Sequence, residues 1–440
     1  MLKTKNLSRL LRKALVIVAC GSMFAGLLQT STAQNDPAKD GRYYEAAARK
    51  AYQAQDYTAF LEDMRMAAQL RPNHPRLMYN LAVAYALNGQ RAEALSWLDK
   101  VANMGLVVRP GDDKDFESIK DTPEFKAIVA HIEANKLPVG KSLPAFTVHE
   151  KGLVPESVAF DAATNTFFLS SVYKRKILRV APNGEVTDFA TEQDGLWSVM
   201  GIKVDAARRI LWVCTAAHPQ MSHYKPEENG KSGVLKFDLK TGKLVQKYLL
   251  ENKPAPHWLG DLVLDSKGNV FASDSISPAI YIVRPEKNEI ELFVADKAFG
   301  SPQGMAFSQD GKSLFMADYA FGIFVIDLTT RKVTNCAAPA DGTLLGIDGL
   351  YNYHGNLIAV QNGVNPQRVV KLSIAPDLSH INRVETIAAN APVWDEPTLG
   401  VLVKDTFYYV ANSQWGMIDD KGQLAAEEKL KDPIVMKLRL

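Results

Sequence analysis

From residue 157 onward, a short apolar stretch, a tight turn and a second apolar stretch ending in Ser, Asp or Asn recur along the chain. Clear copies run over residues 157–171, 261–274 and 304–318, and further ones over 201–205, 349–360 and 400–412. The copies are 44, 60, 43, 45 and 51 residues apart, counted between the equivalent positions Val158, Ile202, Leu262, Met305, Leu350 and Val401. Six copies at this spacing, each with room for four short strands, predict a mainly β fold, a six-bladed β-propeller.

Residues 145–440 are assigned to this propeller, whose last blade needs strands from both ends of the segment. The sixth copy shows only two strands before residue 415, and residues 433–440 are strand-like. Residues 145–149 alternate as a strand does. Because closing the ring removes exposed sheet edges, we expect the strand at 144–150 to pair with the last blade.

Between residues 41 and 136 the apolar spacing changes to i, i+3 and i+4, which predicts helices. The positions Leu81, Ala82, Tyr85, Ala94 and Leu98 match the tetratricopeptide repeat, and so do Ala47, Ala48, Ala51, Phe60 and Met64, 34 residues earlier. Residues 34–136 thus resemble two such repeats with a cap, and residues 137–144 are a proline-containing linker. The helical segment is either a packing domain or a groove for a protein partner, and we expect it to be unstable alone.

The first 33 residues are typical of an export signal. Basic residues without any acid precede the apolar runs 14–19 and 24–28, and Ser31-Thr-Ala33 offers small residues for cleavage. This predicts export, to the periplasm or outside the cell. The alternative is a lipobox at residues 17–20, which would attach a lipid to Cys20. No other stretch approaches the roughly 20 apolar residues of a membrane span.

Charge and cysteine content narrow the range of partners. Without the first 33 residues the chain has 46 basic and 49 acidic side chains, so its net charge is −3 instead of +2. That balance gives no electrostatic basis for binding nucleic acid or an anionic membrane.

Cleavage at Ala33 would leave Cys214 and Cys336, either as buried thiols or as one disulfide between blades.

The first strand of each blade lines the channel of a propeller. Aligning the copies places one residue per blade at the same mouth: Glu156, Met200, Gly260, Gln303, Asp348 and Thr398. Two carboxylates and an amide suit a hard, oxygen-liganded cation such as Ca²⁺, with Glu156, Gln303 and Asp348 as ligands. The alternative is that the two carboxylates only bond backbone amides in turns. A small-molecule ligand is expected at this mouth.

The blade motifs resemble those of the gluconolactonase / senescence-marker-protein family over about residues 150–440. They are Pro155-Glu156-Ser-Val-Ala-Phe-Asp, Gly260-Asp261-Leu-Val-Leu-Asp, Pro302-Gln303-Gly-Met-Ala-Phe and Asp348-Gly349-Leu. The resemblance extends more loosely to paraoxonase-type lactonases and other six-bladed relatives. It implies an enzyme that hydrolyses lactones or esters with a divalent metal, held by a Glu from the first blade, an Asn from the fourth and an Asp from the fifth.

Three positions depart from the family pattern. Gln303 stands at the fourth-blade Asn, and Gly260 stands at a third-blade Asn, which leaves Asp261 as the second member of that pair. Trp258 stands where many members have a substrate-binding Arg. These departures favour the alternative function, a non-catalytic propeller that binds a ligand or a protein.

If the protein is an enzyme, the metal polarises a carbonyl and Asp348 helps to activate water. His257 is the second catalytic candidate, and His218 and His223 lie in neighbouring loops. The residues expected to contact substrate are Asp261, Trp258, Met200 and Thr398. The chain has no Gly-x-Ser-x-Gly, His-Glu-x-x-His, Walker or Cys-x-x-Cys motif, which argues against the chemistry of those sites.

Overall fold

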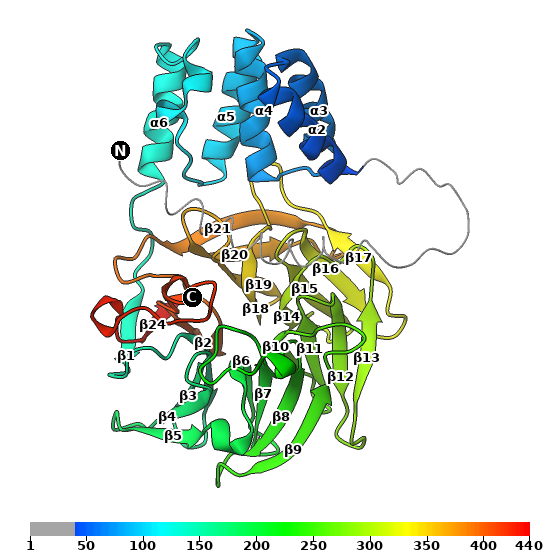
Figure 1. Cartoon of the computed structure of the whole chain (residues 1–440), viewed down its shortest axis with the longest axis vertical. Coiled ribbons are helices and arrows are strands. Elements are labelled where there is room, and N and C mark those ends of the chain that lie inside the picture. Colours follow the sequence, from blue (N-terminus) through cyan, green and yellow to red (C-terminus); the bar gives the residue numbers. More distant parts are fainter. Residues whose placement is uncertain (1–39) are drawn as a thin grey trace. The chain divides into compact units, whose positions relative to one another are not determined.

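The computed structural model describes residues 40–440, so the predicted export signal and Cys20 lie outside the described residues. The chain forms two compact units: residues 40–136 together with Ala340–Thr343, and Leu137–Pro339 together with Leu344–Leu440. The first is helical and the second consists of six β-sheets (Figure 1). In this described part of the chain, no helix has the length and apolarity needed to cross a membrane.

The helical unit consists of α2 Gly41–Gln53, α3 Tyr57–Leu70, α4 Pro75–Leu87, α5 Arg91–Asn103, the 3-10 turns η1 Pro110–Asp112 and η2 Lys114–Phe116, and α6 Pro123–Ala134. Side-chain caps mark where three of the helices begin. Asp40, Asp56 and Thr122 accept backbone N–H bonds in the first turns of α2, α3 and α6. These bonds satisfy amides that have no partner inside the helix.

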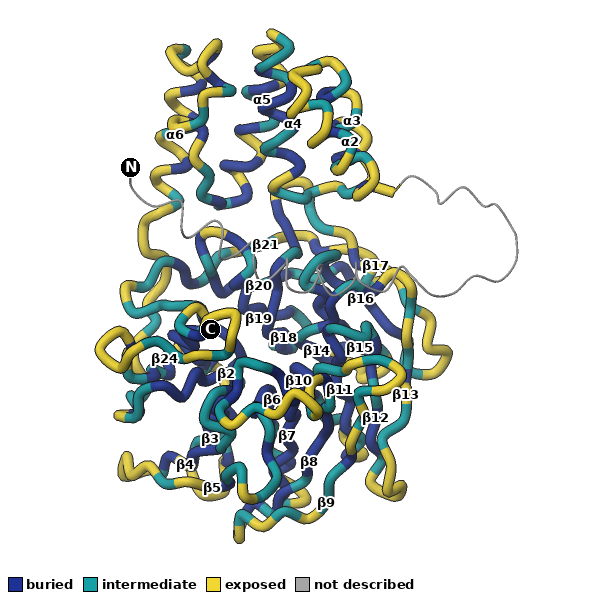
Figure 2. The backbone as a smooth tube through the Cα atoms, viewed as in Figure 1, coloured by how far each residue is buried: buried dark blue, intermediate teal, exposed yellow. Residues whose placement is uncertain are grey.

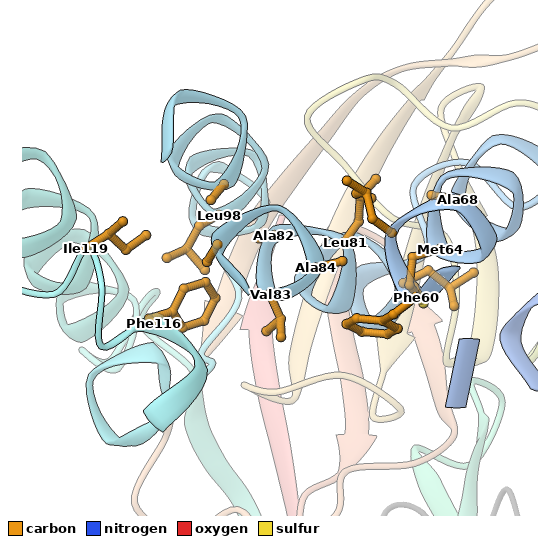
Figure 3. Close-up of a cluster of buried hydrophobic side chains, with 14 of the residues drawn as sticks. Phe60, Met64, Ala68, Leu81, Ala82, Val83, Ala84, Leu98, Phe116 and Ile119 are labelled. Carbon is orange, nitrogen blue, oxygen red and sulfur yellow. The ribbon is translucent and has the colours of Figure 1, made fainter. Parts of the chain in front are cut away.

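The core of the helical unit contains most of the positions predicted from the repeat (Figure 3). Ala82 and Ala94 are fully buried, and their small side chains let α4 and α5 approach closely. Ala48, Phe60 and Met64, at the equivalent positions of the preceding helix pair, are buried as well. The helices and their buried faces agree with the sequence pattern, while membership of the tetratricopeptide class stays a prediction.

Each blade of the second unit is a four-stranded antiparallel sheet that runs from an innermost to an outermost strand. In that order, blade 1 is β2 Pro155–Asp161, β3 Thr166–Ser171, β4 Lys176–Val180 and β5 Val186–Ala190. Blade 2 is β6 Ser198–Asp205, β7 Ile210–Ala216, β8 Ser232–Asp238 and β9 Leu244–Leu250. Blade 3 is β10 Leu259–Leu264, β11 Val270–Asp274, β12 Ala279–Val283 and β13 Ile290–Ala295.

The other three blades follow the same order from the inside outward. Blade 4 is β14 Pro302–Phe307, β15 Ser313–Asp318, β16 Gly322–Asp327 and β17 Val333–Cys336. Blade 5 is β18 Ile347–Tyr353, β19 Asn356–Gln361, β20 Arg368–Ile374 and β21 Ile381–Ala389. Blade 6 is β22 Gly400–Val403, β23 Thr406–Val410, β24 Ile434–Arg439 and β1 Leu143–Thr147.

The blades close into a ring. Each innermost strand contacts the innermost strand of the next blade, and β22 of the last blade contacts β2 of the first. Blade 6 takes strands from both ends of the propeller segment: β1 pairs antiparallel with β24, from Leu143 opposite Lys437 to Thr147 opposite Ile434. The six-bladed propeller and its closure by the strand near residue 145 are therefore confirmed.

The predicted linker is itself attached to the propeller. Val139 forms a bridge with Ala389 at the end of β21, and Asn390 Nδ2 donates to the carbonyl of Leu137 at 3.1 Å. These contacts tie residues 137–139 to blade 5 before the chain enters β1.

The faces of the blades are buried against one another, whereas the outer strands keep exposed positions (Figure 2). Hydrophobic clusters such as Leu169 with Val158 and Val410 join neighbouring blades. Cys214 in β7 and Cys336 in β17 are buried, free thiols, so the structure has no disulfide between these two blades.

The polar residue that ends the second strand of a blade fixes where the first strand begins. Asp318 Oδ2 accepts the backbone N–H bonds of Gly300 and Ser301 at 2.7 and 2.9 Å, and Asp274 Oδ1 accepts that of Trp258 at 3.0 Å. Both carboxylates are fully buried, and buried carboxylates need such bonds. The repeated terminal residue therefore positions the start of the innermost strand.

Candidate functional site at the channel mouth

The innermost strands of blades 1 to 5 all carry a β-bulge near their start. Bulges re-aim side chains and are frequent next to active sites. The bulged segments contain the residues that the sequence places in one ring layer, namely Glu156, Met200, Gly260, Gln303 and Asp348. The first strand of blade 6 starts later, at Gly400, and has no bulge, so Thr398 lies before it.

Glu156 is buried where blade 1 meets blade 6. Its carboxylate Oε2 accepts the indole N–H of Trp415 at 2.6 Å. Its backbone carbonyl accepts the hydroxyl of Thr398 at 2.8 Å and the N–H of Leu399 at 3.0 Å. Thr398, predicted to contact substrate, thus helps to hold the backbone of Glu156 in place.

Asp348 is held by a side-chain amide of its own blade. Asn362 Nδ2 donates to Asp348 Oδ2 at 2.6 Å, and the hydroxyl of Tyr319 donates to Asn362 Oδ1 at 3.0 Å. Burial raises the pKa of Tyr319 well above its ordinary value, and three negative charges add to this effect: Asp348, Glu396 and Glu156. The two predicted carboxylate ligands therefore both act on the same partly buried phenol.

Gln303 presents an amide oxygen to the ring. Its Nε2 donates to Ser301 Oγ at 3.0 Å, and its Oε1 accepts no hydrogen bond from the residues that the structure describes. A Cβ atom at Gly260 would lie 3.7 Å from this Oε1. The absence of a side chain at Gly260 therefore leaves the place next to the amide oxygen open.

Asp261 is buried and pairs with a lysine of the second blade. Its Oδ1 lies 3.3 Å from Lys203 Nζ, while its Oδ2 has no hydrogen-bond partner within residues 40–440. The same ammonium lies 5.5 Å from the centre of the Tyr351 ring. Burial raises the pKa of Asp261, and the charge of Lys203 opposes that rise. Asp261 therefore belongs to a buried Lys203–Asp261–Tyr351 cluster.

Trp258 belongs to an aromatic stack. Its ring lies nearly parallel to that of His218, with centroids 4.1 Å apart, and Trp415 approaches the same imidazole at 5.9 Å. Because Trp415 also donates to Glu156, the stack adjoins the first predicted ligand. Met200 is buried in the same apolar cluster as Trp258.

His257 is bound to a buried carboxylate of blade 3. Its Nδ1 lies 2.6 Å from Asp274 Oδ2, and its ring meets Tyr281 edge-on. No hydrogen bond within residues 40–440 joins His257 to Gln303 or to the carboxylates of Glu156 and Asp348. The structure therefore assigns His257 to its own pair with Asp274.

Sequence reasoning missed Glu396, Asn362 and Tyr319. Tyr319 and Asn362 each directly follow the second strand of their blade, β15 and β19, so the repeat itself held a signal for them. Glu396 lies in the irregular segment before β22, where no periodicity points to it. Its negative charge, like those of Asp348 and Glu156, raises the pKa of Tyr319.

Backbone strain accompanies the segments that supply these side chains. Val154, two residues before Glu156, has φ of 49°, and Glu396 and Gln414 have φ of 70° and 63°. Left-handed backbone is unfavourable for any side chain and most of all for a β-branched one. Strain of this kind clusters at functional sites, where the surrounding structure enforces it.

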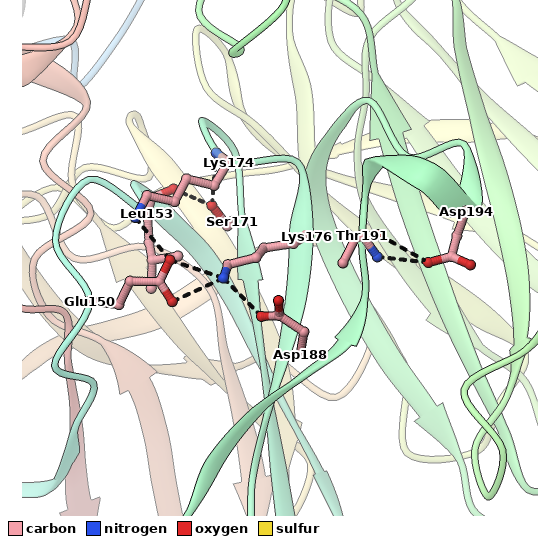
Figure 4. A network of polar contacts seen from close by, with 8 residues as sticks. All are labelled: Glu150, Leu153, Ser171, Lys174, Lys176, Asp188, Thr191 and Asp194. Carbon is pink, nitrogen blue, oxygen red and sulfur yellow. Dashed lines mark hydrogen bonds and ion pairs between the residues drawn. The ribbon is translucent and has the colours of Figure 1, made fainter.

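Two surface hollows of about 450 Å³ each lie beside blade 1, and their lining includes none of the channel-mouth residues. Lys174 borders both, and its Nζ donates to Glu150 at 2.8 Å (Figure 4). Lys176 donates to Glu150 at 3.0 Å and to Asp188 at 2.8 Å. Because these ammonium groups already have carboxylate partners, the hollows offer little net charge to an anionic ligand.

No model of a known protein family matches the chain, and no curated protein matches it. Solved structures share its architecture. A gluconolactonase from Xanthomonas campestris has 14% identity and a TM-score of 0.44, covering 69% of this chain and 99% of its own. A calcium-binding regucalcin from Agrobacterium tumefaciens has 18% identity and a TM-score of 0.45, covering 67% and 93%.

A PQQ-bound aldose sugar dehydrogenase from Streptomyces coelicolor is similar to the same extent, with 13% identity, a TM-score of 0.47 and coverage of 69% and 99%. No conclusion about the chemistry of this chain rests on these three structures. The chain is a six-bladed propeller with an N-terminal helical unit, and the basis for its function lies in its own residues.

Proposed function

We propose that this protein binds a divalent cation at the channel mouth through Glu156, Gln303 and Asp348 and hydrolyses a small lactone or ester there. The observation that supports this most is the set of equivalent bulges, which gives the three oxygen-bearing side chains matching positions in blades 1, 4 and 5. N–H donors from Trp415 and Asn362 orient the two carboxylates. Such outer partners pre-organise ligands for a metal.

The donor set fits a hard cation such as Ca²⁺, which takes roughly six to eight oxygen ligands. Within residues 40–440 no group of three or more His, Cys, Asp or Glu side chains is arranged to hold a metal. An amide oxygen can supply the third protein ligand. Gln303 Oε1 meets that need because its own nitrogen is bonded to Ser301 and the oxygen faces the place that Gly260 leaves open.

When bound, a cation of this kind supplies Lewis acidity that polarises the carbonyl of a lactone or ester. Asp348, oriented by Asn362, accepts a proton from the attacking water, and Glu396 is the neighbouring acid. His257 is the second candidate base. Asp274 holds its Nδ1, so its Nε2 is the nitrogen that takes up a proton.

A panel of lactones and aryl esters, assayed with full-length protein and Ca²⁺, Mn²⁺ or Zn²⁺, tests the hydrolase. We expect turnover with at least one pairing and a loss of roughly 100-fold or more in Asp348→Asn, since general base catalysis contributes about that much. Asp405→Asn, an exposed carboxylate on the turn after β22, is the matched control and should keep full activity. Turnover that survives Asp348→Asn contradicts this role for Asp348.

A non-catalytic binding protein is the second candidate, and two positions favour it. Trp258 stacks on His218, and Gly260 has no side chain, so neither offers the polar contact that the family resemblance implies. On this account the helical unit adds a surface for a protein partner. Cation binding without turnover of any substrate in the panel would select this function.

We also propose that the protein is exported, because a basic segment, an apolar run and small residues occur in that order before Gln34. Cell fractionation and N-terminal sequencing of the mature protein test this. A mature chain that begins at Gln34 supports cleavage by signal peptidase, a lipid-modified Cys20 supports the lipoprotein alternative, and an intact Met1 in the cytoplasm contradicts export.

A further inference from the structure

His218 carries a buried ring nitrogen without a hydrogen-bond partner. The residue is 2% exposed, and nothing among the described residues bonds to its Nε2. Its Nδ1 lies 2.9 Å from the side-chain oxygen Oε1 of Gln220, which accepts a hydrogen bond from it. A donor at Nδ1 leaves Nε2 of the neutral ring as an acceptor. This buried acceptor needs a donor that the described chain does not supply.

The indoles around His218 do not satisfy this acceptor. Trp258 covers one face of the imidazole at an interplanar angle of 12°, and Trp415 lies at 30° to it. The lone pair of Nε2 points outward in the plane of the imidazole, not toward a face stacked on it. Burial also lowers the pKa of His218 to about 4, so the ring is neutral near pH 7.

The stack borders the acidic residues of the mouth. Trp415 donates its indole N–H to Glu156 Oε2 at 2.6 Å, and Trp258 lies two residues before Gly260 in blade 3. Both indoles are only partly buried, while the imidazole that both of them contact is fully buried. Flat apolar faces and a neutral acceptor therefore occur next to a carboxylate.

We propose that His218, Trp258 and Trp415 form an aromatic subsite for the ligand. An aromatic ring of the ligand packs on the indoles, and His218 Nε2 accepts a hydrogen bond from an N–H or O–H group attached to that ring. Large aromatic side chains bind flat apolar groups well, whereas a hydroxyl-rich ligand needs several polar partners. This inference rests on the proposed function and specifies its substrates as aromatic lactones or aryl esters, in preference to sugar lactones.

Calorimetric titration with two hydrolysis-resistant lactams tests the subsite without requiring turnover. One is 3,4-dihydroquinolin-2-one, which carries a fused benzene ring, and the other is δ-valerolactam, which lacks it. We expect the full-length protein to bind the aromatic lactam roughly 10-fold more tightly, as a stacked aromatic pair would give. Equal or weaker binding of the aromatic lactam, or no binding of either, overturns the inference.

Three variants assign the effect to individual residues. Trp258→Leu should lower the affinity for the aromatic lactam roughly 5- to 10-fold and the affinity for δ-valerolactam less than about 2-fold. Trp258→Phe keeps a stacking face and should retain most of the affinity. His218→Phe keeps the stack but removes the Nε2 acceptor and should weaken binding of the aromatic lactam about 5-fold. Trp394→Phe, whose ring packs on Tyr409 in blade 6, is the control and should bind as wild type.

The outcomes separate the subsite from the hydrolase. Hydrolysis of lactones together with unchanged lactam affinities in Trp258→Leu and His218→Phe rejects the subsite and leaves the hydrolase standing. If these variants lose affinity for the aromatic lactam only, and the wild-type protein hydrolyses no substrate of the panel, the subsite is supported and the hydrolase is rejected. Equal weakening of both lactams in Trp258→Leu means that the stack only supports the fold, and this too rejects the subsite.

Discussion

Asn362 donates its side-chain N–H to the carboxylate of Asp348 at 2.6 Å, and it is itself oriented by the hydroxyl of Tyr319 at 3.0 Å. The two hydrogen bonds form a chain from blade 4 through blade 5 to the mouth. Because Asn362 is 2% exposed, water competes little for either bond. Asp348 is therefore held in one orientation by a residue that does not belong to the predicted ligand set.

Removing this support should weaken cation binding. We expect Asn362→Leu to lower the affinity for Ca²⁺ roughly 10-fold, the usual effect of losing an outer partner of a ligand, and Tyr319→Phe to lower it less. Calorimetric titration measures both, with Asn183→Ala on an exposed turn of blade 1 as the control. An Asn362→Leu variant that folds and binds Ca²⁺ like the wild type would show that the bond is not needed.

Two glycines at neighbouring bulges should respond differently to alanine. A Cβ at Gly201 would lie 2.6 Å from Asp261 Oδ1, whereas a Cβ at Gly260 would lie 3.7 Å from Gln303 Oε1, an ordinary contact. Gly201→Ala should therefore cost about 1–3 kcal/mol of unfolding free energy, as overpacking does. Gly260→Ala should change it by less than about 0.5 kcal/mol. Urea unfolding compares the two, and equal costs would contradict the packing described for Asp261.

His218 should make the fold sensitive to acid. Its pKa falls from an ordinary value of about 6.5 to about 4 in the folded protein, so the folded state favours the neutral ring. Above about pH 6.5 the neutral ring contributes roughly 3 kcal/mol to the free energy of unfolding. This contribution is lost as the pH falls toward 4. His218→Phe should remove this part of the pH dependence. Parallel pH–stability curves for both proteins would contradict a depressed pKa.

The isolated helical unit, expressed as residues 34–136, should be weakly folded, because two repeats and a cap bury little apolar surface. The propeller expressed from residue 137 should still fold, since its ring is closed by β1 and β24. Circular dichroism and thermal melts of the two fragments measure this. A cooperative, high-melting helical fragment would show an independent domain and favour a separate partner-binding role.

The blades were predictable because their burial pattern repeats. Each blade buries its faces only on its neighbours, so equivalent positions such as Val158 and Ile202 stay apolar in copy after copy. The closing strand was predictable for a related reason: the sixth copy lacked strands that residues near 145 and 435 supply.

The mouth was predictable only in part. Glu156, Gln303 and Asp348 share a repeat position, but the bulge that re-aims them is a change of register that apolar periodicity does not reveal. Trp415 reaches Glu156 from an irregular segment 259 residues away in the chain. The stacking of His218 likewise depends on contacts between blades, so its loop position alone did not distinguish it from an exposed histidine such as His223.

The cation content of the purified protein tests the central claim most directly. Elemental analysis and Ca²⁺ titration should be run on wild type, Glu156→Gln, Asp348→Asn and the control Glu286→Gln, an exposed carboxylate on the turn between β12 and β13. We predict about one ion per chain in wild type and control, and a loss of at least roughly 10-fold in affinity in each mouth variant. Equal cation content in all four proteins, or none in any of them, would contradict a metal site at the mouth.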